Sequence, residues 1–188
     1  MSDVARELPR RHRYTVGELH RMAAAGVFGG DDRVELIQGE IIDMAPIGSR
    51  HAGTVAQFSE LLRGTLGERG LVWVQSPLAL GEYSAPQPDI AVLAPRADFY
   101  KEHLPGPAEV WLVIEVADTT MAYDRDTKLP LYADHGIPEA WLVDLEGGQL
   151  LRRRAGGENC EAVTDLESVV LPTPPGGRVD LSDVFATP

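Results

Sequence analysis

Two acidic residues stand out because their spacing could let them hold one metal ion. Asp89 follows Pro88 at the start of a β-prone run, and Glu115 comes 26 residues later, directly after the apolar run 111–114. Neighbouring strands lie about 4.8 Å apart, and Mg²⁺ prefers oxygen ligands at about 2.1 Å. Carboxylates on one face of adjacent strands could therefore share a hard divalent cation, and we expect a metal site on Asp89 and Glu115.

A lysine completes this group of candidate residues. The 17 basic residues are 15 arginines and only two lysines, Lys101 and Lys128. In a chain whose usual cation is arginine, a lysine marks a place where a compact ammonium suits the task better than a planar guanidinium. Lys128 follows Glu115 by 13 residues, so the chain has room to leave the sheet, start a helix and return the ammonium to the carboxylates.

Each of the three residues also has a purely structural interpretation. Asp89 could cap a turn before its strand, and Glu115 could emerge into solvent at the end of its own strand. Lys128 could lie on a solvated helix face, paired with Asp124 at i,i+4. Taken singly, the residues favour these interpretations, whereas the combination of all three favours a metal site with an adjacent ammonium.

His51 and Glu35 are further candidates whose roles the spacing leaves open. His51 shares an apolar stripe with Val55 and Phe58 near the start of an expected helix, so it should point inward. A histidine in such a position is usually a hydrogen-bonded residue at the core edge, although it can also carry protons. Glu35 alternates with apolar neighbours in a β-prone run and could face either side.

The N-terminal half of the chain predicts two helices and a hairpin that must position these residues. Thr15 and Glu18 form a capping-box pattern that predicts a helix over 15–25. A hairpin over 34–44 is expected to turn at Gln38-Gly39. Ser49 can cap a second, amphipathic helix that runs to about Gly67. Strands are expected over 71–75, 89–93, 110–116 and 140–145.

The most apolar strand indicates how the sheet is built. Residues 111–114 show no polar alternation, which is typical of a central strand covered by helices on both faces. A helix over 123–133 should be short or kinked, because Pro130 lacks the N–H that a regular helix needs. Two more strands, around 150–153 and 161–163, a Pro/Gly loop at 172–177 and a closing turn at 181–185 should follow.

Composition limits the possible classes of protein. A chain of 188 residues with 44% hydrophobic residues can bury one core, and no compositional break divides it, so we expect a single domain over 1–188. The charged N-terminus and the absence of a long apolar window predict a cytoplasmic protein without a membrane segment. The single Cys160 leaves no disulfide or CxxC site. A net charge of -12 excludes a broad basic nucleic-acid surface, so any such contact must be local.

Several segments together resemble a known family. They are the hairpin segment 34–40, His51, the segment 88–92 and the segment 112–116. The most specific block spans 123–133 and then 136–144, with Tyr123, Asp124 and Lys128 in its first part. This combination resembles the Uma-type restriction endonucleases, a branch of the PD-(D/E)XK nuclease superfamily.

The resemblance implies an α/β, restriction-endonuclease-like fold: a mixed central sheet flanked by helices, with an extra N-terminal helix and hairpin and C-terminal strands. The core would span about 15–146 and the C-terminal β extension about 147–188. Asp89 and Glu115 would bind Mg²⁺ or Mn²⁺, and Lys128 would be the signature lysine, displaced to the helix. Glu35 and His51 would complete the catalytic pocket. The implied substrate is nucleic acid, DNA in particular, and a homodimer is expected because cleavage of two strands favours two sites.

Two other functions are compatible with the same residues. The chain could be a binding or regulatory module that keeps the nuclease fold without cutting, which the acidic composition favours. It could also be a glycosidase that uses Asp89 and Glu115 as its acid and base. A lysine beside the carboxylates and a need for a divalent metal would count against the glycosidase.

Overall fold

The structure is a computed structural model that describes residues 11–30, 32–172 and 174–186. Positions 1–10, whose charged residues supported the expectation of a cytoplasmic protein, lie outside the described residues. Within the described residues, no helix is both long and apolar enough to cross a membrane.

Six strands form a central sheet in the order β3-β4-β5-β6-β7-β8. Strands β5 and β6 are parallel, and all other neighbouring pairs are antiparallel, so the predicted mixed sheet is confirmed. The strands are β3 (Leu71–Val74), β4 (Ile90–Leu93), β5 (Val110–Ala117), β6 (Glu139–Asp144), β7 (Gln149–Arg154) and β8 (Glu161–Val163).

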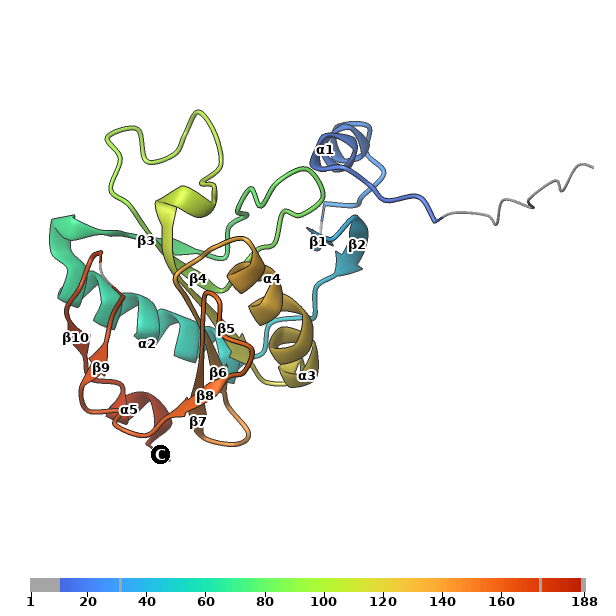
Figure 1. Cartoon of the computed structure of the whole chain (residues 1–188). Helices are drawn as coiled ribbons and strands as arrows, with labels where there is room; N and C mark the ends of the chain where they lie inside the picture. The colour runs from blue at the N-terminus through green and yellow to red at the C-terminus, as the bar shows by residue number, and fades with distance from the viewer. Residues whose placement is uncertain (1–10, 31, 173, 187–188) are drawn as a thin grey trace, which may run out of the picture.

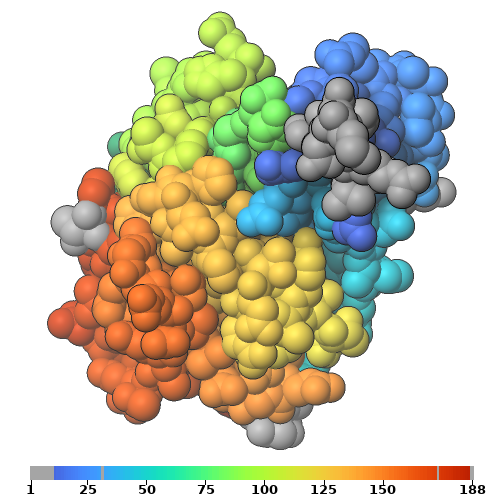
Figure 2. Space-filling model, turned by 45° about the vertical axis from the view of Figure 1, so that its right-hand side comes forward, coloured from blue at the N-terminus to red at the C-terminus, as the bar shows by residue number. Residues whose placement is uncertain are grey.

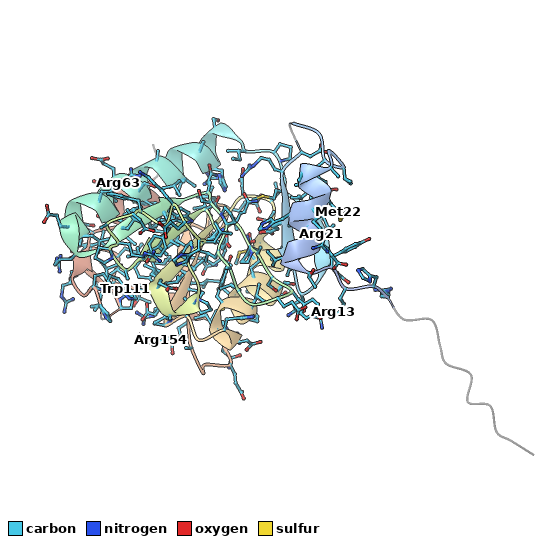
Figure 3. The ribbon with its side chains drawn as sticks, turned by 90° about the horizontal axis from the view of Figure 1, so that it is seen from above. Arg13, Arg21, Met22, Arg63, Trp111 and Arg154 are labelled. Atoms are coloured by element: carbon cyan, nitrogen blue, oxygen red, sulfur yellow. The ribbon has the colours of Figure 1, made fainter. Side chains whose placement is uncertain are left out.

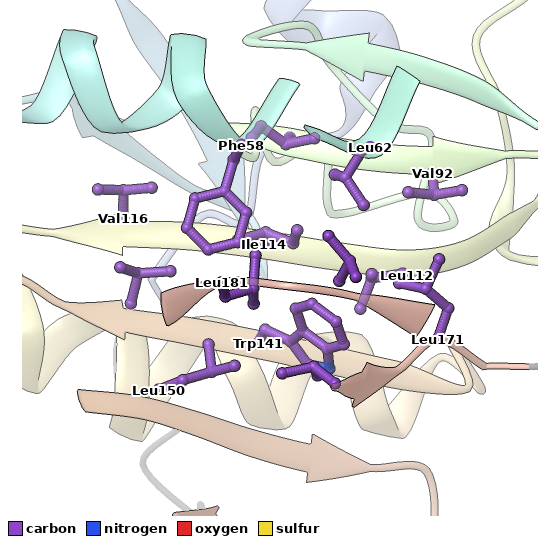
Figure 4. Packing of buried hydrophobic residues seen from close by; sticks show 14 of the residues in the cluster. Phe58, Leu62, Val92, Leu112, Ile114, Val116, Trp141, Leu150, Leu171 and Leu181 are labelled. Atoms are coloured by element: carbon purple, nitrogen blue, oxygen red, sulfur yellow. The ribbon is translucent and has the colours of Figure 1, made fainter. Parts of the chain in front are cut away.

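The two faces of the sheet carry separate apolar layers, as the run at 111–114 predicted. Helix α2 (Ser49–Leu66) covers one face with Phe58 and Leu62, which pack on Ile114 and Trp141 (Figure 4). Helix α4 (Leu129–Asp134) covers the other face. Strand β5 is thus buried on both sides. The first helical residue of α2 is Ser49, but its N-cap is Gly48, so Ser49 does not cap the helix as expected.

The N-terminal helix and hairpin form a small unit at one end of the sheet (Figures 1 and 3). Helix α1 (Val16–Ala24) has the predicted capping box, in which Thr15 and Glu18 bond each other's backbone N–H. Strands β1 (Val34–Ile37) and β2 (Glu40–Asp43) pair around Gln38 and Gly39, both with positive φ. A Cβ on Gly39 would lie 2.7 Å from the Cβ of Arg13, so only glycine fits this turn.

The segment that carries Lys128 is helical but irregular. Helix α3 (Met121–Tyr123) continues into a π-helical turn, Asp124–Lys128, and then into α4. The N–H of Leu129 reaches back five residues to the carbonyl of Asp124, and the next residue, Pro130, has no N–H to donate. The predicted kink is therefore present as a widened turn that ends at Lys128.

The C-terminal part contains more regular secondary structure than expected. Strands β7 and β8 extend the central sheet, which confirms the two predicted strands. The predicted Pro/Gly loop is present, and it joins two short antiparallel strands, β9 (Val169–Val170) and β10 (Arg178–Val179), into a second small hairpin. The short helix α5 (Ser182–Phe185) follows this hairpin. The sequence pattern missed this hairpin because two-residue strands are too short to show an alternation. Its Val169 and Val179 join the core beneath α2.

Candidate active site

One cavity of about 220 Å³ brings the five candidate residues together. His51 comes from the N-terminus of α2, and Asp89 directly precedes β4. Glu115 lies near the end of β5, Glu35 in the hairpin and Lys128 in the π-helical turn. Figure 2 shows the yellow surface of the α3–α4 segment beside the blue and cyan surface of the hairpin and the residues after it. Segments far apart in the sequence therefore enclose the cavity.

The sheet register sets Asp89 beside Glu115. Strands β4 and β5 run antiparallel with Ile90 opposite Ile114, so the residue before Ile90 lies opposite the residue after Ile114. Asp89 Oδ2 accepts the backbone N–H of Val116 at 2.9 Å and lies 3.0 Å from His51 Nε2. Asp89 is therefore fixed by β5 on one side and by α2 on the other, and does not simply cap a turn.

Glu115 is held from the α4 side of the sheet. Its Oε1 lies 2.8 Å from Lys128 Nζ and accepts the hydroxyl of Tyr132 at 2.5 Å. The Glu115 and Lys128 side chains are only 3% and 5% exposed. Glu115 thus does not emerge into solvent, and Lys128 does not lie on a solvated helix face. Among the described residues, the contacts to Glu115 all use Oε1, which leaves Oε2 for another ligand.

Glu35 joins the site through the hairpin. Its Oε2 lies 3.3 Å from Lys128 Nζ and accepts the backbone N–H of Gln87 at 3.1 Å. Lys128 therefore bridges Glu35 and Glu115, and in the described residues its ion pairs go to these two acids and not to Asp124.

Burial and neighbouring charges shift the pKa values of these groups. Burial raises the pKa of Glu115 to about 8, although Lys128 opposes the shift. Burial also raises the pKa of Asp124. Burial alone would raise the pKa of Asp89, but the hydrogen bond and the charge of His51 keep this pKa below its usual value. The hydrogen bond to Asp89 in turn raises the pKa of His51.

The acidic groups of the cavity outnumber its cations. Glu35, Glu115 and Asp124 are all buried, Asp89 is nearly so, and Lys128 is the one buried cation among the described residues. Uncompensated buried carboxylates are unfavourable unless they take up protons or a cation. A set of hard carboxylate oxygens suits Mg²⁺ or Mn²⁺. Asp89 and Glu115 offer oxygens of this kind, but no three His, Cys, Asp or Glu side chains in the described residues already converge closely enough to hold an ion.

Three residues of the site were missed or given no role by the sequence reasoning. Asp124 is buried and accepts the hydroxyl of Thr120 at 2.5 Å. Tyr132 binds Glu115, and Tyr123 lines the cavity with a buried hydroxyl that has no hydrogen-bond partner in the described residues. The available signal was their spacing around Lys128, at one turn before it and one turn after it.

Comparisons with known proteins agree with this fold. Residues 16–182 match the family Uma2, described as "Putative restriction endonuclease". The match covers most of the chain, and the protein belongs to this family, as the sequence resemblance predicted. The family description is that of a nuclease, a class of hydrolase.

A solved structure shows the same fold. It is the crystal structure of a putative nuclease of the DUF820 group from Anabaena variabilis, with a TM-score of 0.68 and 16% sequence identity, covering 91% of this chain and 97% of that one. The predicted α/β nuclease-like fold is therefore confirmed. None of the curated proteins compared with this chain is a match.

Proposed function

We propose that this protein is a Mg²⁺- or Mn²⁺-dependent endonuclease that hydrolyses phosphodiester bonds in DNA. The observation that carries the proposal is the juxtaposition of Asp89 and Glu115 in one cavity with a buried lysine 2.8 Å from Glu115. Family membership supports the nuclease class, and the carboxylate-rich cavity supports the need for a divalent cation.

Asp89 and Glu115 would hold the metal through the oxygens that face the cavity. When bound, the metal would lower the pKa of a water molecule and neutralise charge on the scissile phosphate. Lys128 would stabilise the negative charge that develops on the phosphate, or orient the attacking water. His51 and Glu35 would act as positioning residues, because His51 contacts Asp89 and Glu35 contacts Lys128.

The two rival functions differ in how well the geometry supports them. A glycosidase needs one carboxyl as acid and another as base or nucleophile. Here Glu115 is paired with a lysine and a tyrosine hydroxyl at 3% exposure, which favours a charge-stabilising site. A nuclease-fold module that binds without cutting has the same cavity, so only an activity measurement separates it from the nuclease. The homodimer stays a prediction, tested by the solution mass.

The test is cleavage of labelled DNA in EDTA, Mg²⁺ and Mn²⁺, with the wild type and with Asp89→Asn and Glu115→Gln. These variants keep the size of each side chain while removing its charge. Arg63→Gln is a matched surface control, because this exposed residue lies 12 positions along α2 from His51, about 18 Å away. We expect metal-dependent cleavage that both site variants reduce at least a hundredfold. Equal cleavage by the site variants and the control would contradict the proposal.

A further inference from the structure

The β1–β2 hairpin turns one of its faces towards the cavity. Glu35 lies opposite Ile42 in the register, and the pairing continues beyond the strands, because the N–H of Met44 donates to the carbonyl of Arg33 at 2.9 Å. Residues that lie opposite each other in an antiparallel pair share a face, and so do residues two apart along one strand. One face of the hairpin therefore carries four residues, and all of them line the cavity: Arg33, Glu35, Ile42 and Met44.

The hairpin fixes the position of Arg33 relative to Lys128. Glu35 Oε2 lies 3.3 Å from Lys128 Nζ and accepts the backbone N–H of Gln87 at 3.1 Å, so this part of β1 is held against the site. A strand advances about 3.3 Å per residue, which puts the backbone of Arg33 about 7 Å along the hairpin from that of Glu35. Glu35 is buried, whereas Arg33 is half-buried. Arg33 therefore lies closer to the surface than the acidic centre does.

Arg33 differs from Lys128 in having no acidic partner. The lining of the cavity contains one arginine and one lysine, and the lysine is paired with Glu35 and Glu115. Within the ranges that the structure describes, Arg33 forms no ion pair and its side chain forms no hydrogen bond. The charge of Lys128 is thus already balanced by protein carboxylates, whereas that of Arg33 can balance an anion that enters from outside.

A phosphate of a nucleic acid backbone is an anion that suits an arginine. The guanidinium presents a planar fork of N–H donors that can bind two phosphate oxygens at once. A nucleic acid carries a phosphate at every nucleotide, so a neighbouring phosphate can meet Arg33 while another approaches the carboxylates. These carboxylates repel an incoming anion, and a cation at the side of the cavity offsets part of that repulsion.

We infer that Arg33 is a substrate-binding residue, whose guanidinium holds a backbone phosphate next to the one at the acidic centre. The inference rests on the proposed nuclease function, because it adds a residue to the same site. The hairpin then has two tasks, since it binds the substrate through Arg33 and positions Lys128 through Glu35. Contacts to phosphate carry no sequence information, so Arg33 should contribute equally to the binding of any DNA sequence.

Binding in the absence of cleavage tests the inference first. Fluorescence anisotropy measures the affinity for a labelled DNA oligonucleotide, as a duplex and as a single strand, at several salt concentrations. Ca²⁺ replaces Mg²⁺ and Mn²⁺ because it also prefers oxygen ligands, and gels of the same samples show that the DNA stays intact. We expect Arg33→Gln to weaken binding several-fold. The slope of log affinity against log salt should fall by about 0.7–0.9, the value for one lost phosphate contact.

Arg21→Gln is the matched control. It removes the same charge from an exposed arginine of α1, in the same N-terminal unit but outside the lining of the cavity (Figure 3). Affinity and salt slope should stay at the wild-type values in this variant. Arg33→Lys keeps the charge but loses the fork, so its affinity should lie between those of the wild type and Arg33→Gln. Equal affinities of the wild type and Arg33→Gln, an equal loss in Arg21→Gln, or no binding by the wild type overturns the inference.

Cleavage measured with Mn²⁺ separates the inference from the proposed function. Loss of a contact that is equally strong before and during the reaction raises KM much more than it changes kcat, so Arg33→Gln should raise KM several-fold. Binding that depends on Arg33 without any cleavage would contradict the nuclease and support the inference. Cleavage with the same KM in the wild type and Arg33→Gln would support the nuclease and overturn the inference.

Discussion

Lys128 Nζ lies 2.8 Å from Glu115 Oε1, and both side chains are shielded from solvent in the centre of the molecule. Glu35 lies on the other side of the ammonium at 3.3 Å. Lys128 therefore has two functions in this account. It neutralises carboxylates that the fold buries, and it offers a positive charge to a phosphate that enters the cavity.

Replacement of Lys128 by methionine should reduce stability as well as activity. Methionine fills a similar volume but leaves Glu35 and Glu115 buried without their cation, and loss of one partner of a buried ion pair typically costs about 3–5 kcal/mol. The free energy of unfolding from urea titrations at pH 7 measures this loss. Adding Glu35→Gln to the methionine variant should restore part of it, because the uncompensated charge of Glu35 disappears. A double variant no more stable than Lys128→Met would contradict this electrostatic explanation.

The pH dependence of stability should report the buried carboxyl of Glu115. Its pKa is raised from 4.5 to about 8 by burial, so between these values the folded protein holds a proton that the unfolded chain releases. Stability from this group is therefore complete below about pH 4.5 and falls as the pH rises towards 8. Without metal, the unfolding free energy of the wild type relative to Glu115→Gln should decline over this range, by up to a few kcal/mol at about 1.4 kcal/mol per pKa unit.

Repeating this titration with added Mn²⁺ provides its control. A divalent cation bound to the ionised carboxylates would displace the proton, so Mn²⁺ should flatten the decline in the wild type and leave Glu115→Gln unchanged. A difference between wild type and variant that stays constant from pH 5 to pH 8 would show that Glu115 is ionised throughout.

Removal of the hydroxyl should affect the stability of the protein differently at two tyrosines near the site. Tyr132→Phe removes the hydrogen bond to buried Glu115 and should lower the unfolding free energy by about 1–3 kcal/mol. Tyr123→Phe removes a buried hydroxyl without a partner in the described residues, so it should leave stability unchanged or slightly increased. Thermal unfolding of both variants measures the difference. An equal loss for the two would mean that the Tyr123 hydroxyl has a partner in solution.

Much of the fold could be predicted because the relevant signals are local. The apolar run before Glu115 identified the central strand, and the capping box of Thr15 identified the first helix. Asp89 directly precedes one strand and Glu115 lies in another. The two side chains come together if these two strands are neighbours in the sheet. That requirement is a property of the whole sheet, and the sequence supported it only through the family resemblance.

The rest of the site depends on long-range contacts. Glu35 could face either side in the sequence pattern, and its direction is set by Gln87, 52 residues away, and by Lys128. The partners of Lys128 follow from the π-helical turn, since an ordinary helix would favour a pair with Asp124. The burial of Asp124 likewise involves segments far away in the sequence, because the hairpin residues Glu35 and Asp43 line the same cavity. Residue spacing puts Asp124 one turn from Lys128, but it indicates neither the ion pairs of Lys128 nor the burial of Asp124.

The direct test of the account is a crystal of the protein soaked in Mn²⁺ and measured at a wavelength where manganese scatters anomalously. The account predicts a strong anomalous peak within about 2–2.5 Å of one oxygen each of Asp89 and Glu115, in the range for hard divalent cations. The peak should be absent in Asp89→Asn crystals treated identically. Well-ordered Asp89 and Glu115 side chains without any anomalous density between them would contradict the proposed metal-dependent mechanism.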